Sequence, residues 1–151
     1  MASLKQAVCL ATKAAEVAAV RELFAEYARR VDEPCCFADF EAELASLPGE
    51  YKLFLLEDAA GCVAVRFLDR QTAEMKRLYV RSAHRGKGFG RALAEAAIAA
   101  AREAGCARIV LDTLPKMSEA QGLYRTLGFR PIAPYLKDPT PGALCFELSL
   151  S

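Results

Sequence analysis

The chain has 151 residues, 54% of them hydrophobic, so it can bury the core of one ordinary domain without a disulfide or a structural metal. Its 20 Lys and Arg residues against 19 Asp and Glu give a net charge of +1, which argues against a general nucleic-acid-binding protein. The longest apolar run, around Ala96–Ala101, is far shorter than the roughly 20 residues that cross a bilayer, and no signal-peptide pattern opens the chain. We expect one domain over residues 1–151, in the cytoplasm, with neither a membrane nor a nucleic-acid partner.

The cysteines do not have the spacing of a metal site. There are six, none in a Cys-x-x-Cys pair, and the single histidine is His84. Because a zinc site needs clustered thiolate or imidazole ligands, we expect no metal. We expect reduced thiols that are mostly small buried hydrophobes, with the vicinal pair Cys35 and Cys36 as the one place to watch for oxidation.

The first third of the chain predicts a strand followed by two helices. Gln6–Ala11 is a short apolar stretch suited to a strand, and Thr12 can cap the helix that follows. Apolar residues then recur at helical spacing, which predicts a helix over 13–30 that ends at Pro34. A second short helix is indicated by Phe37, Phe40, Glu41 and Leu44 and is stopped by Pro48-Gly49.

Three strands are predicted in the middle of the chain. Tyr51–Glu57 and Cys62–Leu68 flank a hairpin turn in which we expect Gly61 to take a positive φ. The third strand, Ala73–Val80, alternates in polarity. A regular strand would place on one face Met75, Arg77 and Tyr79, and on the other Glu74, Lys76, Leu78 and Val80.

The second half reads as helix, strand, helix and two strands. A basic loop over Arg81–Gly90 leads into an alanine-striped helix closed by Gly105, and Arg108–Asp112 is the next strand. Ser118 and Gln121 have the spacing of a capping box for a helix whose inner stripe is Ala120, Leu123, Tyr124 and Leu127. Strands over Phe129–Ala133 and Ala143–Leu150 finish the chain. The order β-α-α-β-β-β-α-β-α-β-β predicts an α+β fold with a mixed sheet.

The most informative segment is the loop Arg85-Gly86-Lys87-Gly88-Phe89-Gly90-Arg91, which follows a strand and opens a helix. Its three glycines allow close approach of the backbone, and free amides at a helix N-terminus form an anion site. The loop lacks the Lys-Ser/Thr of a Walker A motif and the third glycine of a dinucleotide fingerprint. We therefore predict a phosphate or pyrophosphate site; the alternative is a basic turn that only starts a helix.

Two motifs together point to a known family. Arg85-x-x-Gly88-x-Gly90 resembles the Arg/Gln-x-x-Gly-x-Gly/Ala signature of the GNAT superfamily of N-acetyltransferases. Downstream, the segment from Ala120 to Phe129 is similar to the Ala-x-x-Leu-Tyr-x-x-x-Gly-Phe segment of that family. The specific motifs cover about 72–131, and the element order of the whole chain also matches.

The resemblance implies transfer of an acetyl group from acetyl-CoA to an amine by direct attack on the thioester. It implies that the loop holds the CoA pyrophosphate and that the end of the preceding strand pairs with the pantetheine arm. The cofactor-binding residues would then be Leu78, Tyr79, Val80, Arg85, Gly86, Lys87, Gly88, Phe89, Gly90 and Arg91. A departure is Met117, which stands where many relatives carry an Asn that contacts the cofactor.

The resemblance also suggests two catalytic groups. Glu74, eleven residues before Arg85, is the candidate base; the alternative is a solvated strand carboxylate paired with Lys76 or Arg66. Tyr124 is the candidate acid that protonates the leaving thiolate; the alternative is a core aromatic. Asp112 can assist or cap a turn, and His84 is a weaker candidate base.

The acceptor stays open between two hints. If Arg66 or Arg77 points into the pocket, an acceptor bearing a carboxylate is favoured. The acidic residues of helices 13–46 favour instead a cationic acceptor such as a polyamine or a lysine side chain. A longer acyl-CoA donor and a non-catalytic acyl-CoA-binding module are the rival functions, and edge strands favour a homodimer.

Overall fold

The computed structural model describes residues 7–32 and 39–150, so the predicted Cys35-Cys36 pair, Pro34 and Phe37 lie outside the described residues. The elements follow the predicted order. The helices are α1 Ala14–Val31, α2 Phe40–Ser46, α3 Phe89–Glu103 and α4 Ser118–Thr126. The strands are β1 Val8–Leu10, β2 Lys52–Leu56, β3 Gly61–Phe67, β4 Thr72–Val80, β5 Arg108–Thr113, β6 Arg130–Ile132 and β7 Leu144–Ser149. No helix within these described ranges is both long and apolar enough to cross a membrane.

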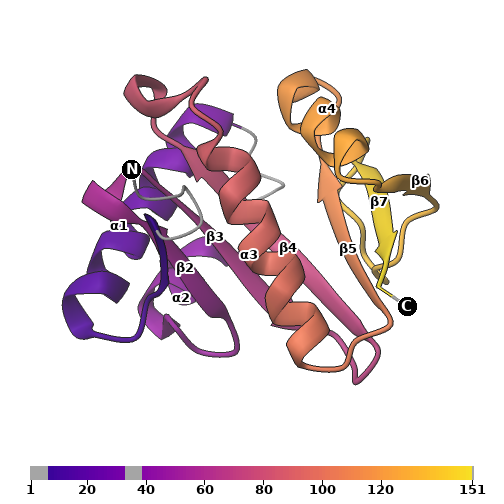
Figure 1. Cartoon of the computed structure of the whole chain (residues 1–151), viewed down its shortest axis with the longest axis horizontal. Helices are drawn as coiled ribbons and strands as arrows, with labels where there is room; N and C mark the ends of the chain where they lie inside the picture. The colour runs from indigo at the N-terminus through magenta and orange to yellow at the C-terminus, as the bar shows by residue number, and fades with distance from the viewer. Residues whose placement is uncertain (1–6, 33–38, 151) are drawn as a thin grey trace.

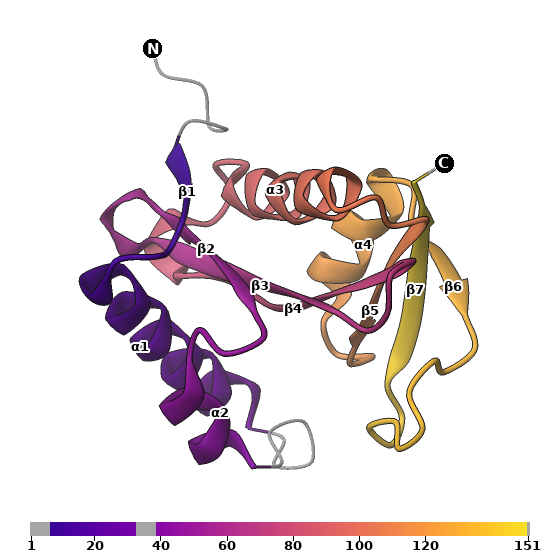
Figure 2. The same cartoon turned by 90° about the horizontal axis from the view of Figure 1, so that it is seen from below.

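The seven strands of the described residues join one mixed sheet in the order β1-β2-β3-β4-β5-β7-β6. Every neighbouring pair is antiparallel except β4 and β5, which are parallel and are connected through α3. Helices α3 and α4 cover one face of the sheet, and α1 and α2 cover the other (Figure 2). The mixed α+β architecture predicted from the sequence is therefore confirmed.

The pairing of β4 with β5 is short. Only three residue pairs are in register, from Thr72 opposite Arg108 to Glu74 opposite Val110. Beyond Glu74 the two strands diverge, which is visible in Figure 1 as a widening gap between β4 and β5. The backbone groups of β4 that face β5 beyond this point are thus left without a strand partner.

A β-bulge in β4 changes the predicted alternation. Cys62 of β3 pairs with Tyr79, whereas Ala64 pairs with Lys76, so β4 has one residue more than β3 between these pairs. Arg77, in the bulge, has a φ of +59°. Because the extra residue inverts the facing of all later side chains, Tyr79 lies on the α1 side and not on the face of Met75. Leu78 and Val80 pack with Met75 on the α3 side, and the expected grouping of these residues is wrong for the same reason.

The turn before β3 also differs from the prediction. The positive φ values fall on Asp58 and Ala59, at +58° and +52°, and not on Gly61. Gly61 begins β3, where an added Cβ would lie 2.4 Å from the carbonyl oxygen of Tyr79. Glycine is required here because β3 approaches the backbone of β4 closely.

Two helix ends differ from their predicted form. The N-cap of α1 is Lys13 and not Thr12, and the Glu16 carboxylate accepts the amide hydrogens of both residues. Ser118 is the first residue of α4, after the N-cap Met117, so no capping box forms. The side chain of Gln121 instead donates to the carbonyls that precede the helix. The predicted end of α3 is confirmed, since Gly105 follows it with a φ of +80°.

The core has one layer on each face of the sheet. On the α3 side, the small side chains of Ala94, Ala97 and Ala101 are buried, which lets the helix lie close to the strands. On the α1 side the largest fully buried side chains are Phe24, Leu23 and Leu53. Among the described cysteines, Cys62, Cys106 and Cys145 are buried and Cys9 is exposed, and all four are free. Burial raises the pKa of Cys62 far above the usual thiol range, so this thiol stays protonated.

The close contact at Gly61 gives a stability prediction. Gly61→Ala should destabilise the protein by about 1–3 kcal/mol, because the new Cβ forces β3 and β4 apart. Gly122→Ala is the matched control, since Gly122 is exposed on α4 with open space around its Cα. That substitution should stabilise by about 0.5–1 kcal/mol. Urea unfolding of both variants measures the difference, and equal stabilities would contradict the close approach.

Candidate active site

A cleft of about 930 Å³ opens where β4 and β5 separate. Its walls come from both strands, from α1 and α2, from α4 and from the loop that enters α3. Most of the predicted cofactor-binding residues line it: Leu78, Tyr79, Val80, Arg85, Gly86, Gly88, Phe89 and Gly90. Lys87 and Arg91, which were predicted with them, are not part of its lining.

The loop before α3 presents a row of unpaired backbone amides. Gly86 and Gly88 have φ values of +77° and +82°, which favour glycine, and Gly88 is the N-cap of α3. The first amide of this region with a backbone acceptor is that of Ala92, which donates to the Gly88 carbonyl at 3.1 Å. Within the described residues, the amides of 86–91 have no hydrogen-bond acceptor. Such amides at the positive end of a helix form an anion site.

The basic side chains of the loop are mostly engaged elsewhere. Arg85 Nε donates to the Val80 carbonyl at 3.0 Å, which fixes the loop on the end of β4. Arg91 pairs with Glu95 at 3.0 Å and reaches Thr126 of α4 at 3.4 Å. The capacity of the loop to hold an anion therefore lies chiefly in its backbone amides, with Arg85 lining the cleft beside them.

Tyr124 of α4 is buried but reaches the cleft. Its ring packs against Phe129 and Phe146, with centroids 5.7 and 6.3 Å away, and the residue is among those that line the cleft. No hydrogen bond joins its hydroxyl to another described residue. Burial raises the pKa of this phenol far above its usual range, so the hydroxyl keeps its proton at neutral pH. The side chain is thus both a core aromatic and an available hydrogen-bond donor.

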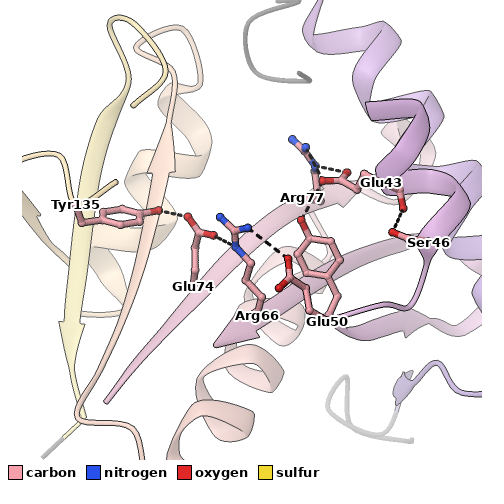
Figure 3. Close-up of polar contacts among 8 residues, drawn as sticks. Glu43, Ser46, Glu50, Arg66, Glu74, Arg77 and Tyr135 are labelled. Carbon is pink, nitrogen blue, oxygen red and sulfur yellow. Dashed lines mark hydrogen bonds and ion pairs between the residues drawn. The ribbon is translucent and has the colours of Figure 1, made fainter. Parts of the chain in front are cut away.

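Glu74 lies beneath the cleft and is fully buried. One carboxylate oxygen accepts from Arg66 Nε at 2.6 Å and the other from the Tyr135 hydroxyl at 2.5 Å (Figure 3). The pairing with Arg66 that the sequence offered as an alternative is present, although the carboxylate is not solvated. Glu74 is not part of the cleft lining, and its role as a base stays a prediction.

Tyr135 is the residue of this cluster that the sequence analysis missed. It lies in the Pro-rich loop between β6 and β7, where no periodicity or motif marks it. Its contact with Glu74 joins residues 61 positions apart in the chain, and burial raises the pKa of its phenol. Only the sheet order, which brings the β6–β7 loop over β5 toward β4, reveals the contact.

Arg66 and Arg77 both line the cleft, which is the condition under which the sequence favoured an acceptor bearing a carboxylate. Each guanidinium group is, however, already paired with a carboxylate of the protein. Besides Glu74, Arg66 lies 3.7 Å from Glu50. Arg77 donates twice to Glu43 of α2, at 3.2 Å each, and Glu43 also accepts from the Tyr51 hydroxyl (Figure 3). The positive charge of both guanidinium groups is therefore largely balanced within the protein.

Met117 occupies the position where many relatives carry an Asn. Its sulfur accepts from Thr113 Oγ1 at 3.4 Å and lies 3.9 Å from the Tyr27 hydroxyl. The residue lines the cleft, so this part of the wall is a thioether that connects α1 with α4. His84 also lines the cleft, at the loop end, with its ring 6.3 Å from that of Phe89.

Comparison with known proteins identifies the family of this chain. Residues 17–129 match the acetyltransferase (GNAT) family, and the chain belongs to it, as the two motifs predicted. An uncharacterized N-acetyltransferase of Schizosaccharomyces pombe is 39% identical over 94 residues, which are 62% of this chain and 58% of that protein. The chain spans 34–58% of the length of the curated relatives that share 37–39% identity with it.

Solved structures of acetyltransferases have the same fold. A GNAT-family acetyltransferase of Staphylococcus aureus superposes with a TM-score of 0.78 at 19% identity, covering 95% of this chain and 98% of that one. A Salmonella typhimurium acetyltransferase, solved with its cofactor acetyl-CoA, gives 0.72 at 22% identity, covering 95% and 93%. At such identities the likeness establishes the fold.

Asp112, on the β5 side of the cleft, gives a prediction for stability against pH. Burial, and then the charge of Glu74, raise the pKa of this carboxyl in the folded state. Its stabilising contribution is therefore present at low pH and lost as pH rises through the folded pKa. Asp112→Asn should raise the unfolding midpoint at neutral pH, and the gain should shrink toward about pH 4.

Asp69 is the matched control, because the pKa of its carboxyl is shifted in the opposite direction to that of Asp112. Its carboxylate accepts the Gln71 amide, which lowers its pKa. Asp69→Asn should lower the midpoint at neutral pH, and this loss should fade as the pH falls. Thermal unfolding of both variants between about pH 4 and 7 measures the two slopes. Slopes of the same sign would contradict the environment assigned to Asp112.

Proposed function

We propose that the protein transfers an acetyl group from acetyl-CoA to a primary amine of a small molecule or peptide, by direct attack in a ternary complex. The observation that carries this proposal is the row of unpaired amides at 86–91 directly beside the gap between β4 and β5. The acetyl-CoA in the Salmonella typhimurium structure of the same fold supports the choice of donor.

The two features fit the two ends of acetyl-CoA. The pyrophosphate is a double anion, and the amides of 86–91 can each donate to one of its oxygens. The pantetheine arm is an extended chain with amide groups, and the β5-facing edge of Leu78–Val80 has backbone groups without a strand partner. The arm can therefore add to β4 as a strand would, which leads the thioester toward Tyr124.

The proton balance of the reaction needs an acid and a base. The amine nitrogen forms a bond to the thioester carbon, the carbon–sulfur bond breaks, and the thiolate leaves. Tyr124 can protonate that thiolate, because its hydroxyl faces the cleft and donates to no described residue. An alkyl ammonium has a pKa of about 10.4, so freeing the amine near pH 7 costs about 4–5 kcal/mol unless a base accepts the proton.

Glu74 remains the proposed base. Its carboxylate accepts a hydrogen bond from Arg66 Nε at 2.6 Å, which fixes its position beside β3. Because the side chain is buried and both oxygens accept hydrogen bonds, proton transfer to it has to pass through a water molecule or a rearranged contact. Arg66 and Arg77, predicted to bind substrate, can do so only in competition with Glu74, Glu50 and Glu43.

The loop assignment predicts a loss of binding in Gly88→Glu. A side chain and a negative charge among the amides should weaken acetyl-CoA binding at least about 100-fold, which corresponds to about 2.7 kcal/mol. Gly105→Glu is the control, because Gly105 has nearly the same φ, +80° against +82°, at the far end of α3. Calorimetric titration with acetyl-CoA measures both, and an unchanged Kd in Gly88→Glu would remove the loop from the site.

The role of Tyr124 predicts a separation of activity from stability. Tyr124→Phe should lower kcat about 10–100-fold in a free-thiol assay, because the leaving thiolate loses its proton donor. Unfolding free energy should change by less than about 0.5 kcal/mol, since no described residue loses a hydrogen bond. Full activity in this variant would show that Tyr124 has only a structural role.

The role of Glu74 predicts a change in the pH–rate profile. Glu74→Gln should lower kcat most on the acidic side of the profile while leaving the Kd of CoA unchanged. Glu95→Gln is the control, because Glu95 also pairs with an arginine but is on the surface of α3. A Glu74→Gln profile with the shape of the parent's would show that another group accepts the proton.

A further inference from the structure

Two oppositely charged residues occupy corresponding positions on β4 and β5, just beyond the point where the strands stop pairing. The last pair in parallel register is Glu74 and Val110, and two residues further along each strand come Lys76 and Asp112. Both are half-buried and both line the cleft. No hydrogen bond or ion pair joins either side chain to another described residue. The divergence of the strands thus leaves a separated cation and anion on the two walls.

Lys76 differs in this respect from the neighbouring cations of the cleft. Arg66 and Arg77 already face carboxylates, and Lys116 donates to the Val31 carbonyl at 2.7 Å. Burial lowers the pKa of Lys76, and the charges of Arg66 and Arg77 act in the same direction, against those of Glu74 and Asp112. An ammonium that is half-buried and lacks an ion-pair partner gains from a bound carboxylate.

The described residues of α1 and α2 give little support to the other expectation, a cationic acceptor such as a polyamine or a lysine side chain. Of the described acidic residues of α1, α2 and their flanks, only Glu43 lines the cleft. The Glu43 carboxylate accepts hydrogen bonds from Arg77 and the Tyr51 hydroxyl. The Glu26 carboxylate accepts them from Arg81 and the Tyr79 hydroxyl. Among the described carboxylates of the cleft wall, Asp112, Glu119 and Asp138 have no such partner, and Asp112 is the one on β5, at the position that corresponds to Lys76 of β4.

We propose that the acceptor is a free amino acid, whose ammonium contacts Asp112 and whose carboxylate contacts Lys76 across the gap between β4 and β5. This inference rests on the acetyl transfer proposed above. The ammonium gives one proton to the base before attack, and the nitrogen loses a second proton to water as the nitrogen–carbon bond forms. The carbon–sulfur bond breaks, the thiolate takes a proton from Tyr124, and the Tyr124 phenolate regains a proton from water. The product is an N-acetyl amino acid that has lost its positive charge and with it the attraction to Asp112.

Binding and turnover test the acceptor separately. The twenty amino acids and their carboxamides are titrated calorimetrically into the CoA-saturated protein, and the same compounds are assayed for thiol release from acetyl-CoA. We expect binding and release with at least one amino acid and at least 10-fold weaker effects with its carboxamide, because the carboxamide cannot form the charged hydrogen bond to Lys76. Lys76→Met should raise the KM of that amino acid about 10–100-fold with kcat little changed.

Two further variants distinguish charge from general damage. Lys76→Arg should restore most of the lost affinity, because it returns the positive charge to β4. Lys52→Met should leave KM unchanged, since Lys52 is exposed on β2, next to Phe67 and away from the cleft lining. An unchanged KM in Lys76→Met would overturn the assignment of the carboxylate site.

The remaining outcomes separate this inference from the proposed function. Thiol release with carboxamides or simple amines at the efficiency of amino acids would overturn the amino-acid acceptor and leave acetyl transfer standing. Lys76-dependent binding of an amino acid without thiol release would support the site and contradict acetyl transfer. Neither binding nor release with any amino acid would overturn the inference, and failure to bind acetyl-CoA would contradict the proposed function itself.

Discussion

The early separation of β4 and β5 is the constraint on which the rest of the structure depends. A parallel pair in the middle of a sheet normally continues through the length of its strands, but here three residue pairs are formed before the strands part. The separation leaves backbone groups of β4 without a strand partner and opens the cleft that Tyr124 of α4 lines. It also leaves Lys76 of β4 and Asp112 of β5 in the cleft lining. The β-bulge at Arg77 accompanies it and turns Tyr79 toward α1, where its hydroxyl donates to Glu26.

The base of the gap is held by a buried polar cluster. Glu74 sits at the last paired position of β4 and receives Arg66 from β3 and Tyr135 from the β6–β7 loop, so three segments meet at one carboxylate. Removing one partner of such a buried pair leaves an uncompensated charge, which costs far more than a surface ion pair. The cluster therefore fixes the relative position of the two halves of the sheet where the cleft begins, whatever part Glu74 takes in proton transfer.

The sequence predicted the parts of the molecule that depend on local pattern. Element order follows from hydrophobic periodicity, the end of α3 from Gly105, and the family from two motifs that lie on the loop and on α4. The errors arise from contacts between segments distant in sequence. The bulge that redirects Tyr79 depends on register with β3, the requirement at Gly61 is the nearness of the Tyr79 backbone, and the Tyr135–Glu74 contact depends on strand order. Lys76 acquires its role only because β5 moves away from it, which no pattern within β4 encodes.

The central claim is that the amides of 86–91 and the free edge of β4 together bind acetyl-CoA. Titration of the ¹⁵N-labelled protein with CoA, followed by amide chemical shifts, tests both parts in one measurement. The account predicts large shifts at residues 86–91 and 78–80, with little change at β1, the far edge of the sheet. Shifts confined to other surfaces, or none at millimolar CoA, would contradict it.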